Sequence, residues 1–202
     1  MNITILGSGN VGGTLGRKWA AAGHMVTYAT RDPGNPKLAA LMAGAKNIRA
    51  DSYEQALPDA EVVLFAIPSG SVADVAAAQA ARLDGKILID ATNNYSSPVI
   101  NNLEALQRAA PKARIFRAFN SLGWEVFEQP HVGGLQADMF YCGPEGAERK
   151  VVDGLITAIG VRPIWVGELD MARLVDELGF LWVNLVFRRG WSRHTAFKAL
   201  TE

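Results

Sequence analysis

The chain of 202 residues contains a single cysteine, Cys142. A lone cysteine forms no internal disulfide bond and no structural zinc site, so a disulfide-stabilised secreted domain and a zinc finger are both excluded. The three histidines, His24, His131 and His194, have no carboxylate or cysteine at metal-ligand spacing, and we expect no metal site. This pattern favours a reducing, cytoplasmic setting.

The sequence also lacks an excess of charge of either sign, because 20 Lys and Arg residues balance 20 Asp and Glu residues. A general electrostatic affinity for nucleic acid or for an anionic membrane is therefore not expected. The apolar stretch at residues 179–187 is interrupted by Asn184 and is shorter than the roughly 20 residues of a membrane-spanning helix. The first residues show no basic segment followed by a long apolar one, and we expect no targeting segment.

Short β-rich runs alternate with helical runs along the chain. We expect strands at residues 3–6, 25–29, 47–50, 62–66, 86–90, 114–118, 139–142 and 162–166. We expect helices at residues 10–22, 36–42, 53–57, 70–81, 98–109, 146–159 and 170–187. The runs at 62–66 and 87–89 are continuously apolar, which is typical of strands covered on both faces. The alternation predicts an α/β fold, namely a Rossmann-type doubly wound parallel sheet with a C-terminal helix.

We expect two parts, a dinucleotide-binding Rossmann domain at residues 1–168 and a helical extension at residues 169–202. The long helix in the extension is apolar on more than one side, with Leu174, Leu178, Leu181 and Leu185 among its residues. A helix of this kind needs cover on most of its sides. We therefore expect the extension to pack on the same domain or on the partner in a homodimer.

The first expected strand is followed by a G-x-G-x-x-G motif made of Gly7, Ser8, Gly9, Asn10, Val11 and Gly12. In this motif the first glycine permits a tight turn, the second lets a pyrophosphate approach the backbone, and the third lets the helix pack closely on the strand. The helix that follows presents free N–H groups and the positive end of its dipole. The strand before the motif and the helix after it favour a dinucleotide site over a glycine-rich turn without a ligand.

The end of the second expected strand indicates which dinucleotide is bound. An NAD-binding unit usually carries an acidic residue there, whereas this chain has Thr30 and Arg31. A guanidinium can hold a 2′-phosphate with charge-assisted hydrogen bonds, and Lys37 adds positive charge. We therefore predict NADP(H). In the alternative, Arg31 is a surface residue paired with Asp32, and Asp32 takes the ribose of NAD(H).

The carboxyl ends of later strands complete the expected cleft, because open α/β sheets bind ligands there. Ala66, Ile67 and Pro68 are predicted to lie along the cofactor, and Asn93 to hydrogen-bond its carboxamide or ribose. The predicted substrate-facing residues are Asn94, Asn120 and Ser121. No Tyr-x-x-x-Lys pair and no Ser-His-Asp or Cys-His arrangement is present, so we predict no catalytic side chain. The site would hold two flat rings together for hydride transfer.

The order of these motifs resembles that in NADPH-dependent deazaflavin (coenzyme F420) reductases. The resemblance spans nearly the whole chain, through residues 7–12, 29–31, 66–68, 90–94, 118–120 and 167–173. The cytosolic NADPH domain of the STEAP metalloreductases is also similar, including the pair Asn93 and Asn94. Residues 90–92 depart from the deazaflavin reductases, which usually have a proline-containing loop there.

This resemblance implies a homodimer in which NADPH passes a hydride to a stacked acceptor. It implies pyrophosphate contacts at residues 8–11, 2′-phosphate contacts at Thr30 and Arg31, and nicotinamide contacts at Ile67, Pro68 and Asn93. A deazaflavin, an ordinary flavin or another small redox acceptor would fit. In one alternative the chain is an NADP(H)-binding sensor or delivery module without catalysis of its own. A β-hydroxyacid-type dehydrogenase is disfavoured because the last long helix contains no lysine.

Overall fold

The computed structural model describes residues 1–202, except that the side chain of Lys37 lies outside the described part. The chain divides into two compact units, Met1–Ile115 and Phe116–Glu202. The boundary expected at residue 168 falls inside the second unit. The assignment of residues 1–168 to one cofactor-binding domain stays a prediction.

A six-stranded sheet with the order β3-β2-β1-β4-β5-β6 organises the first unit. Its strands are β1 (Asn2–Leu6), β2 (Met25–Ala29), β3 (Ile48–Asp51), β4 (Val62–Phe65), β5 (Ile87–Asp90) and β6 (Arg114–Arg117). The chain moves outward from β1 to β3, then returns to the other side of β1 for β4 to β6. This order is that of the Rossmann fold, and the point of reversal lies between β1 and β4. The predicted doubly wound sheet is confirmed.

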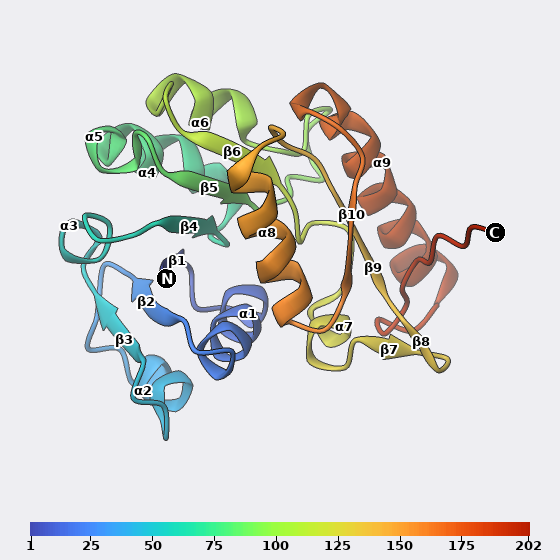
Figure 1. Cartoon of the computed structure of the whole chain (residues 1–202), viewed down its shortest axis with the longest axis horizontal. Coiled ribbons are helices and arrows are strands. Elements are labelled where there is room, and N and C mark those ends of the chain that lie inside the picture. Colours follow the sequence, from blue (N-terminus) through green and yellow to red (C-terminus); the bar gives the residue numbers. More distant parts are fainter. The chain divides into compact units, whose positions relative to one another are not determined.

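Helices cover both faces of this sheet (Figure 1). Helices α1 (Asn10–Ala21) and α2 (Pro36–Met42) lie on one face. Helices α4 (Val72–Ala78), α5 (Ala80–Leu83) and α6 (Leu103–Ala109) lie on the other, and the short α3 (Tyr53–Ala56) connects β3 to β4. Every residue of β4 and β5 is buried, as their continuous apolar sequences predict.

The second unit contains a parallel strand pair and two longer helices. Strands β9 (Asp138–Tyr141) and β10 (Arg162–Trp165) pair in parallel. Along the chain, helix α8 (Ala147–Ala158) connects β9 to β10, and helix α9 (Ala172–Val183) comes after β10. A short helix α7 (Trp124–Glu128) and a hairpin of β7 (His131–Val132) and β8 (Leu135–Gln136) precede β9. The chain beyond α9 is tied back to this unit, since the Trp182 indole N–H donates to the Thr195 carbonyl at 2.9 Å.

Three expected helices differ from those observed. The run at 70–81 is divided at Gln79 into α4 and α5, after a 3-10 turn at Ser69–Ser71. The helix expected at 98–109 begins only at Leu103, because residues 94–102 form a loop held by its own side chains. The helix expected at 170–187 ends at Val183 and continues as a π-helical turn at Asn184–Arg188. The short elements α7, β7 and β8 were not predicted.

Within the described residues, no helix combines the length and the apolar character needed to cross a bilayer.

Candidate functional site

The glycine motif forms the turn between β1 and α1. Gly7 has φ +106°, and a Cβ built on it would lie 2.4 Å from the carbonyl oxygen of Ala66. A Cβ on Gly12 would lie 2.1 Å from the carbonyl oxygen of Gly7. Both positions therefore require glycine for packing. At Gly9 a Cβ would meet no protein atom within 4 Å, so the space beside this residue is open to a ligand.

Helix α1 begins at this open space without a side-chain cap. Gly9 is its N-cap, and the first turn contains no acidic residue. Ser8, Gly9 and Asn10 are exposed and Val11 is half-buried, whereas Gly12 is buried. The first N–H groups of a helix lack partners within the helix, and with the dipole they favour an anion. The turn thus matches the cradle for a pyrophosphate that the sequence predicts.

A pocket of about 240 Å³ lies at the carboxyl end of the sheet beside β2. Arg31 lines it together with Ile67 and Pro68, which follow β4. The structure therefore brings together three residues that the sequence predicts to contact the cofactor. The remaining lining residues are Tyr53, Ser71, Asp74 and Val75. Ala66, one residue before Ile67, is half-buried beside the glycine turn.

Arg31 shares its pocket with the phenol of Tyr53 and the carboxylate of Asp74. Burial raises the pKa of Tyr53, and the positive charge of Arg31 partly opposes this rise. Tyr53 therefore stays a protonated hydroxyl at neutral pH. The Thr30 hydroxyl oxygen accepts the Asp32 backbone N–H at 3.2 Å, which fixes the turn after β2. Arg31 and Asp32 are both exposed, and Asp32 does not line the pocket. The predicted role of Lys37 falls on a side chain outside the described part.

A buried carboxylate orders the loop at the end of β5. Asp90 is completely buried, and its Oδ1 accepts the Thr92 backbone N–H at 2.9 Å and the Thr92 hydroxyl at 2.6 Å. Its Oδ2 accepts the Asn102 backbone N–H at 2.9 Å. Asn93 and Asn94 follow directly and are half-buried. The loop that carries the predicted nicotinamide contact is therefore held by side-chain hydrogen bonds.

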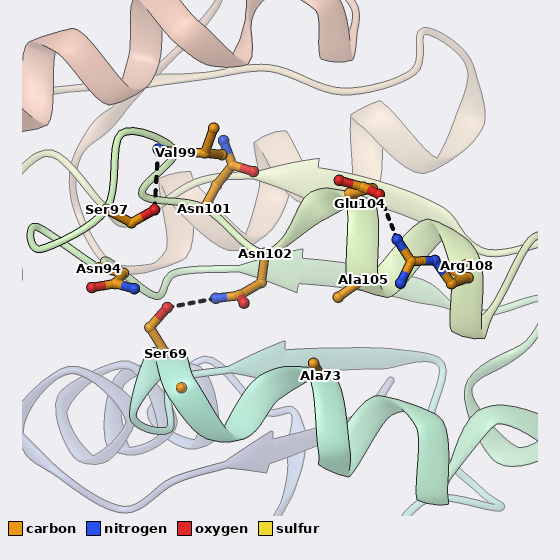
Figure 2. Close-up of a pocket in the computed structure, with 11 residues that line it drawn as sticks. Ser69, Ala73, Asn94, Ser97, Val99, Asn101, Asn102, Glu104, Ala105 and Arg108 are labelled. Carbon is orange, nitrogen blue, oxygen red and sulfur yellow. Dashed lines mark hydrogen bonds and ion pairs between the residues drawn. The ribbon is translucent and has the colours of Figure 1, made fainter.

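A second pocket, of about 390 Å³, lies beside this loop (Figure 2). It is lined by Asn94 and by side chains of α4, α6 and the loop between β5 and α6. Several of these polar groups are already engaged within the loop. The Asn94 Oδ1 accepts the Ser96 N–H, the Ser97 Oγ accepts the Val99 N–H, and Glu104 pairs with Arg108. The lining of this pocket is thus polar, and some of its polar groups also hold the loop in place.

The other two predicted substrate residues, Asn120 and Ser121, lie in the second unit and are buried. The Asn120 side-chain amide lies 3.4 Å from Asp176 Oδ1, and Asp176 Oδ1 accepts the Arg117 Nε–H at 2.8 Å. Within the described residues, the Ser121 hydroxyl has no hydrogen-bond partner. Phe119, just before this pair, has φ +62°, an unfavourable conformation for a bulky residue. Such strain often occurs at functional loops.

The single cysteine is buried in the second unit. Burial raises the pKa of the Cys142 thiol to about 12, so it stays protonated and unreactive at neutral pH. Among the residues that the structure describes, no cluster of three or more His, Cys, Asp or Glu side chains has the arrangement of a metal site.

Comparison with known proteins shows which sequences and structures this chain is similar to. Residues 2–94 match the family described as NADP oxidoreductase, coenzyme F420-dependent. A solved structure from Arthrobacter sp. FB24, described as a candidate F420-dependent NADP reductase, is 25% identical, with a TM-score of 0.80 over 96% of each chain. The resemblance to the F420-dependent reductases is confirmed. The resemblance to the STEAP domain stays a prediction.

Two further proteins are similar to this chain. A protein from Sinorhizobium meliloti with no assigned activity is 26% identical, with a TM-score of 0.69 over 84% of this chain and 86% of its own. A glycerol-3-phosphate dehydrogenase [NAD(P)+] from Pseudomonas fluorescens (strain Pf0-1) is 28% identical over 127 residues, which are 56% of this chain. The match spans only 35% of that enzyme. The chain is thus related to NAD(P)-dependent oxidoreductases such as the F420-dependent family.

Sequence reasoning missed two groups of residues at this site. It did not place Tyr53, Asp74 and Val75 beside Arg31, because they come from α3 and α4 and meet only in the folded chain. It also did not use Asp90 and Asn102. An acidic residue that ends an apolar strand and precedes Thr by two positions is a signal for the local hydrogen bonds seen here.

Proposed function

We propose that this protein binds NADP(H) along the carboxyl edge of its six-stranded sheet and exchanges a hydride with a flavin-like or deazaflavin acceptor. One observation carries the proposal. The same unit combines an uncapped α1 N-terminus beside an open Gly9 with a pocket that contains Arg31. The first feature suits a pyrophosphate, and the second suits an adenosine that carries a 2′-phosphate.

The proposed contacts follow the chain from one end of the cofactor to the other. Residues 8–11 hold the pyrophosphate through their backbone N–H groups. Arg31 and Thr30 hold the 2′-phosphate, and the pocket of about 240 Å³ receives the adenosine. Asn93 orients the nicotinamide. Since Ile67 and Pro68 share this pocket with Arg31, we place them toward the adenosine side as well as along the ring stack.

When bound, the cofactor supplies the hydride, and the chain supplies orientation. Hydride transfer requires the two reacting carbons to be held roughly 3–3.5 Å apart, which is a matter of positioning more than of acid–base chemistry. Asn94, in the first unit, is the proposed acceptor contact, whereas the role predicted for Asn120 and Ser121, which are buried in the second unit, stays a prediction. The similarity to the F420-dependent reductases, and to the Arthrobacter structure over almost the full chain, supports a deazaflavin or flavin as the acceptor.

A second function is a sensor or delivery module that binds NADP(H) without catalysis of its own. The observation that favours it is the small number of reactive side chains in the described residues, since the one cysteine is held protonated. This module would show the same cofactor affinity as the enzyme. It would oxidise NADPH only when a partner protein is present.

We also propose a homodimer that forms through α9. This helix leaves Leu174, Phe180 and Leu181 exposed by 56%, 39% and 46%. Large apolar side chains that are exposed together on one helix suit a protein–protein contact. The dimer is relevant to function because a second copy can cover the extension at residues 169–202.

Calorimetric titration with NADPH and NADH, with and without an oxidised flavin or deazaflavin, tests these functions. The enzyme is expected to bind NADPH more tightly than NADH and to bind it more tightly still when the acceptor is present. NADPH binding that no acceptor alters, together with no oxidation of NADPH, would favour the sensor or delivery module. Absence of binding by either dinucleotide would contradict both.

A further inference from the structure

Two loops that follow neighbouring strands are fastened to each other by one side chain. Asn102 donates from Nδ2 to the Ser69 Oγ at 2.7 Å and to the Thr92 Oγ1 at 2.8 Å. Figure 2 shows Asn102 reaching from the loop before α6 toward Ser69 at the start of α4. Asn102 therefore joins the loop after β4 to the loop after β5. We call Asp90, Thr92, Asn102 and Ser69 the loop clamp.

The loop clamp is rigid at its centre. Asp90 is completely buried and Thr92 is 4% exposed. Each oxygen of the Asp90 carboxylate accepts at least one hydrogen bond, from Thr92 on one side and from the Asn102 backbone on the other. Hydrogen bonds to a buried charged group are stronger than neutral ones. The carboxylate thus fixes Thr92 and the Asn102 backbone, and the Asn102 side chain carries this order across to Ser69.

The residues held by the clamp adjoin the proposed cofactor contacts. Thr92 immediately precedes Asn93, and Ser69 immediately follows Pro68. Neither Thr92 nor Ser69 lines the pocket that contains Arg31. The clamp therefore lies outside that pocket, at the end of the sheet where β4 and β5 lie side by side, and Ser69 and Asn102 line the neighbouring pocket of about 390 Å³. A shift of either loop would displace the proposed cofactor contact beside it.

We infer that Asn102 and Thr92 are positioning residues that set the distance between the two loops and so preorganise the nicotinamide end of the cofactor site. This inference rests on the proposed NADP(H) site. Its expected signature is greatest at the nicotinamide end, because the pyrophosphate and 2′-phosphate contacts lie on other loops, although Ile67 and Pro68 also line the pocket proposed for the adenosine. Loss of the clamp should weaken binding of the nicotinamide and leave binding of the phosphates unchanged.

The test compares two ligands by calorimetry: NADP+, and 2′-phospho-ADP-ribose, which has every part of NADP+ except the nicotinamide. The variants are Ser69→Ala, Thr92→Val and Asn102→Ala. Each is expected to lower the affinity for NADP+ roughly 3- to 10-fold and that for 2′-phospho-ADP-ribose less than twofold. Thr92→Ser keeps the hydroxyl and is expected to bind both ligands as the wild type does.

Asn101→Ala is the matched control. Asn101 lines the same pocket, and its Oδ1 accepts the Leu103 N–H at 3.1 Å, so this bond acts within the start of α6. It should leave the ratio of the two affinities unchanged. Ser69→Ala removes only one acceptor from a half-buried residue, so this variant tests the clamp even if Asn102→Ala fails to fold.

If the wild type binds both ligands, two results would overturn the positioning role of the clamp without overturning the proposed function. One is an equal loss of affinity for the two ligands in Ser69→Ala and Thr92→Val. The other is unchanged NADP+ affinity in both variants. If the wild type binds neither ligand, the proposed function fails, and the role of the clamp fails with it.

Discussion

At the scale of single residues, we expect Arg31 to determine which dinucleotide the proposed site prefers. Arg31→Asp replaces a donor for the 2′-phosphate with a repelling charge. Hydrogen bonds to a charged group contribute roughly 1.5–3 kcal/mol, so NADPH affinity should fall about 10- to 150-fold while NADH affinity stays equal or rises. Calorimetric titration of both dinucleotides measures this change.

The control for this prediction is Arg173→Asp. Arg173 is an exposed arginine of the second unit, where it pairs with Glu177 one turn along α9. The variant makes the same change in charge without touching the pocket, and both dinucleotides should bind it as they bind the wild type. An equal loss of NADPH and NADH affinity in Arg31→Asp would disprove the role given to Arg31, and would favour the alternative in which Asp32 takes the ribose.

The glycines of the motif are expected to separate stability from binding. At Gly9 the backbone has φ −71° and ψ −168°, which alanine adopts freely, and the added Cβ meets no protein atom. Gly9→Ala should therefore change the free energy of unfolding by less than about 0.5 kcal/mol and yet lower NADPH affinity tenfold or more, as an estimate for a blocked pyrophosphate. Thermal unfolding and titration of the same sample give both values.

Gly12→Ala is the contrasting variant. Its Cβ would lie 2.1 Å from a backbone carbonyl oxygen, which has no room to move between β1 and α1. We expect it to lose roughly 1–3 kcal/mol of stability from overpacking. A stable Gly9→Ala protein that binds NADPH normally would mean that the pyrophosphate does not approach this turn.

At the scale of elements, a buried carboxylate holds the C-terminal segment on β9. Asp138 is fully buried, and its oxygens accept hydrogen bonds from Arg162, Lys198 and the Ala199 N–H. Burial by itself would raise the pKa of Asp138, but these hydrogen bonds outweigh it and lower the pKa below its usual value. The charged form is therefore favoured in the folded state.

This shift has a definite sign for stability. A carboxyl group whose pKa is lower in the folded state stabilises the protein above its unfolded pKa of about 4, and that stability is lost as the pH falls through the folded pKa.

We expect Asp138→Asn to lower the free energy of unfolding at pH 7 by roughly 2–4 kcal/mol. Unfolding in denaturant from pH 7 down to pH 3 measures it. The variant should lose less stability on acidification than the wild type, and Glu177→Gln, at an exposed pair, should follow the wild type.

The elements also show how far the sequence alone could predict this fold. The strands of the six-stranded sheet were predicted to within one residue at each end, because apolar runs bounded by glycine or polar residues determine them locally. The helix before β6 was predicted to start five residues early. Its true start depends on Asp90, which accepts the Asn102 N–H from a position twelve residues away. A contact of that range leaves no periodic signal in the sequence.

Only part of the candidate site could be predicted from the sequence. The glycine motif and Arg31 each lie directly after a strand, so the rule that ligands bind at strand carboxyl ends found them. Tyr53 and Asp74 belong to helices, and only the folded arrangement of α3 and α4 places them beside Arg31. Asn120 and Ser121, the other predicted acceptor contacts, belong to a different compact unit from Arg31, and their role stays a prediction.

At the scale of the whole molecule, the exposed apolar face of α9 bears on assembly. Interfaces of stable dimers bury more than about 1,000 Å² and are built on apolar or aromatic residues at their centre. Leu174 and Leu181 lie two turns apart on this helix, and each is about half exposed. We expect the wild type to be a homodimer by light scattering at micromolar concentration. A charge at both positions would be buried without a partner in the dimer, which opposes association.

The double variant Leu174→Glu and Leu181→Glu should therefore be a folded monomer whose unfolding midpoint in denaturant does not change with protein concentration, since both side chains are already about half exposed in the single chain. Leu135→Glu is the matched control, because Leu135 is an equally exposed leucine (53%) in the hairpin of β7 and β8. That variant should remain a dimer. A monomeric wild type, or a double variant that still dimerises, would rule out α9 as the interface. A further outcome is that the double variant still binds NADPH while a flavin no longer makes that binding tighter. This result would mean that each acceptor site needs the second copy.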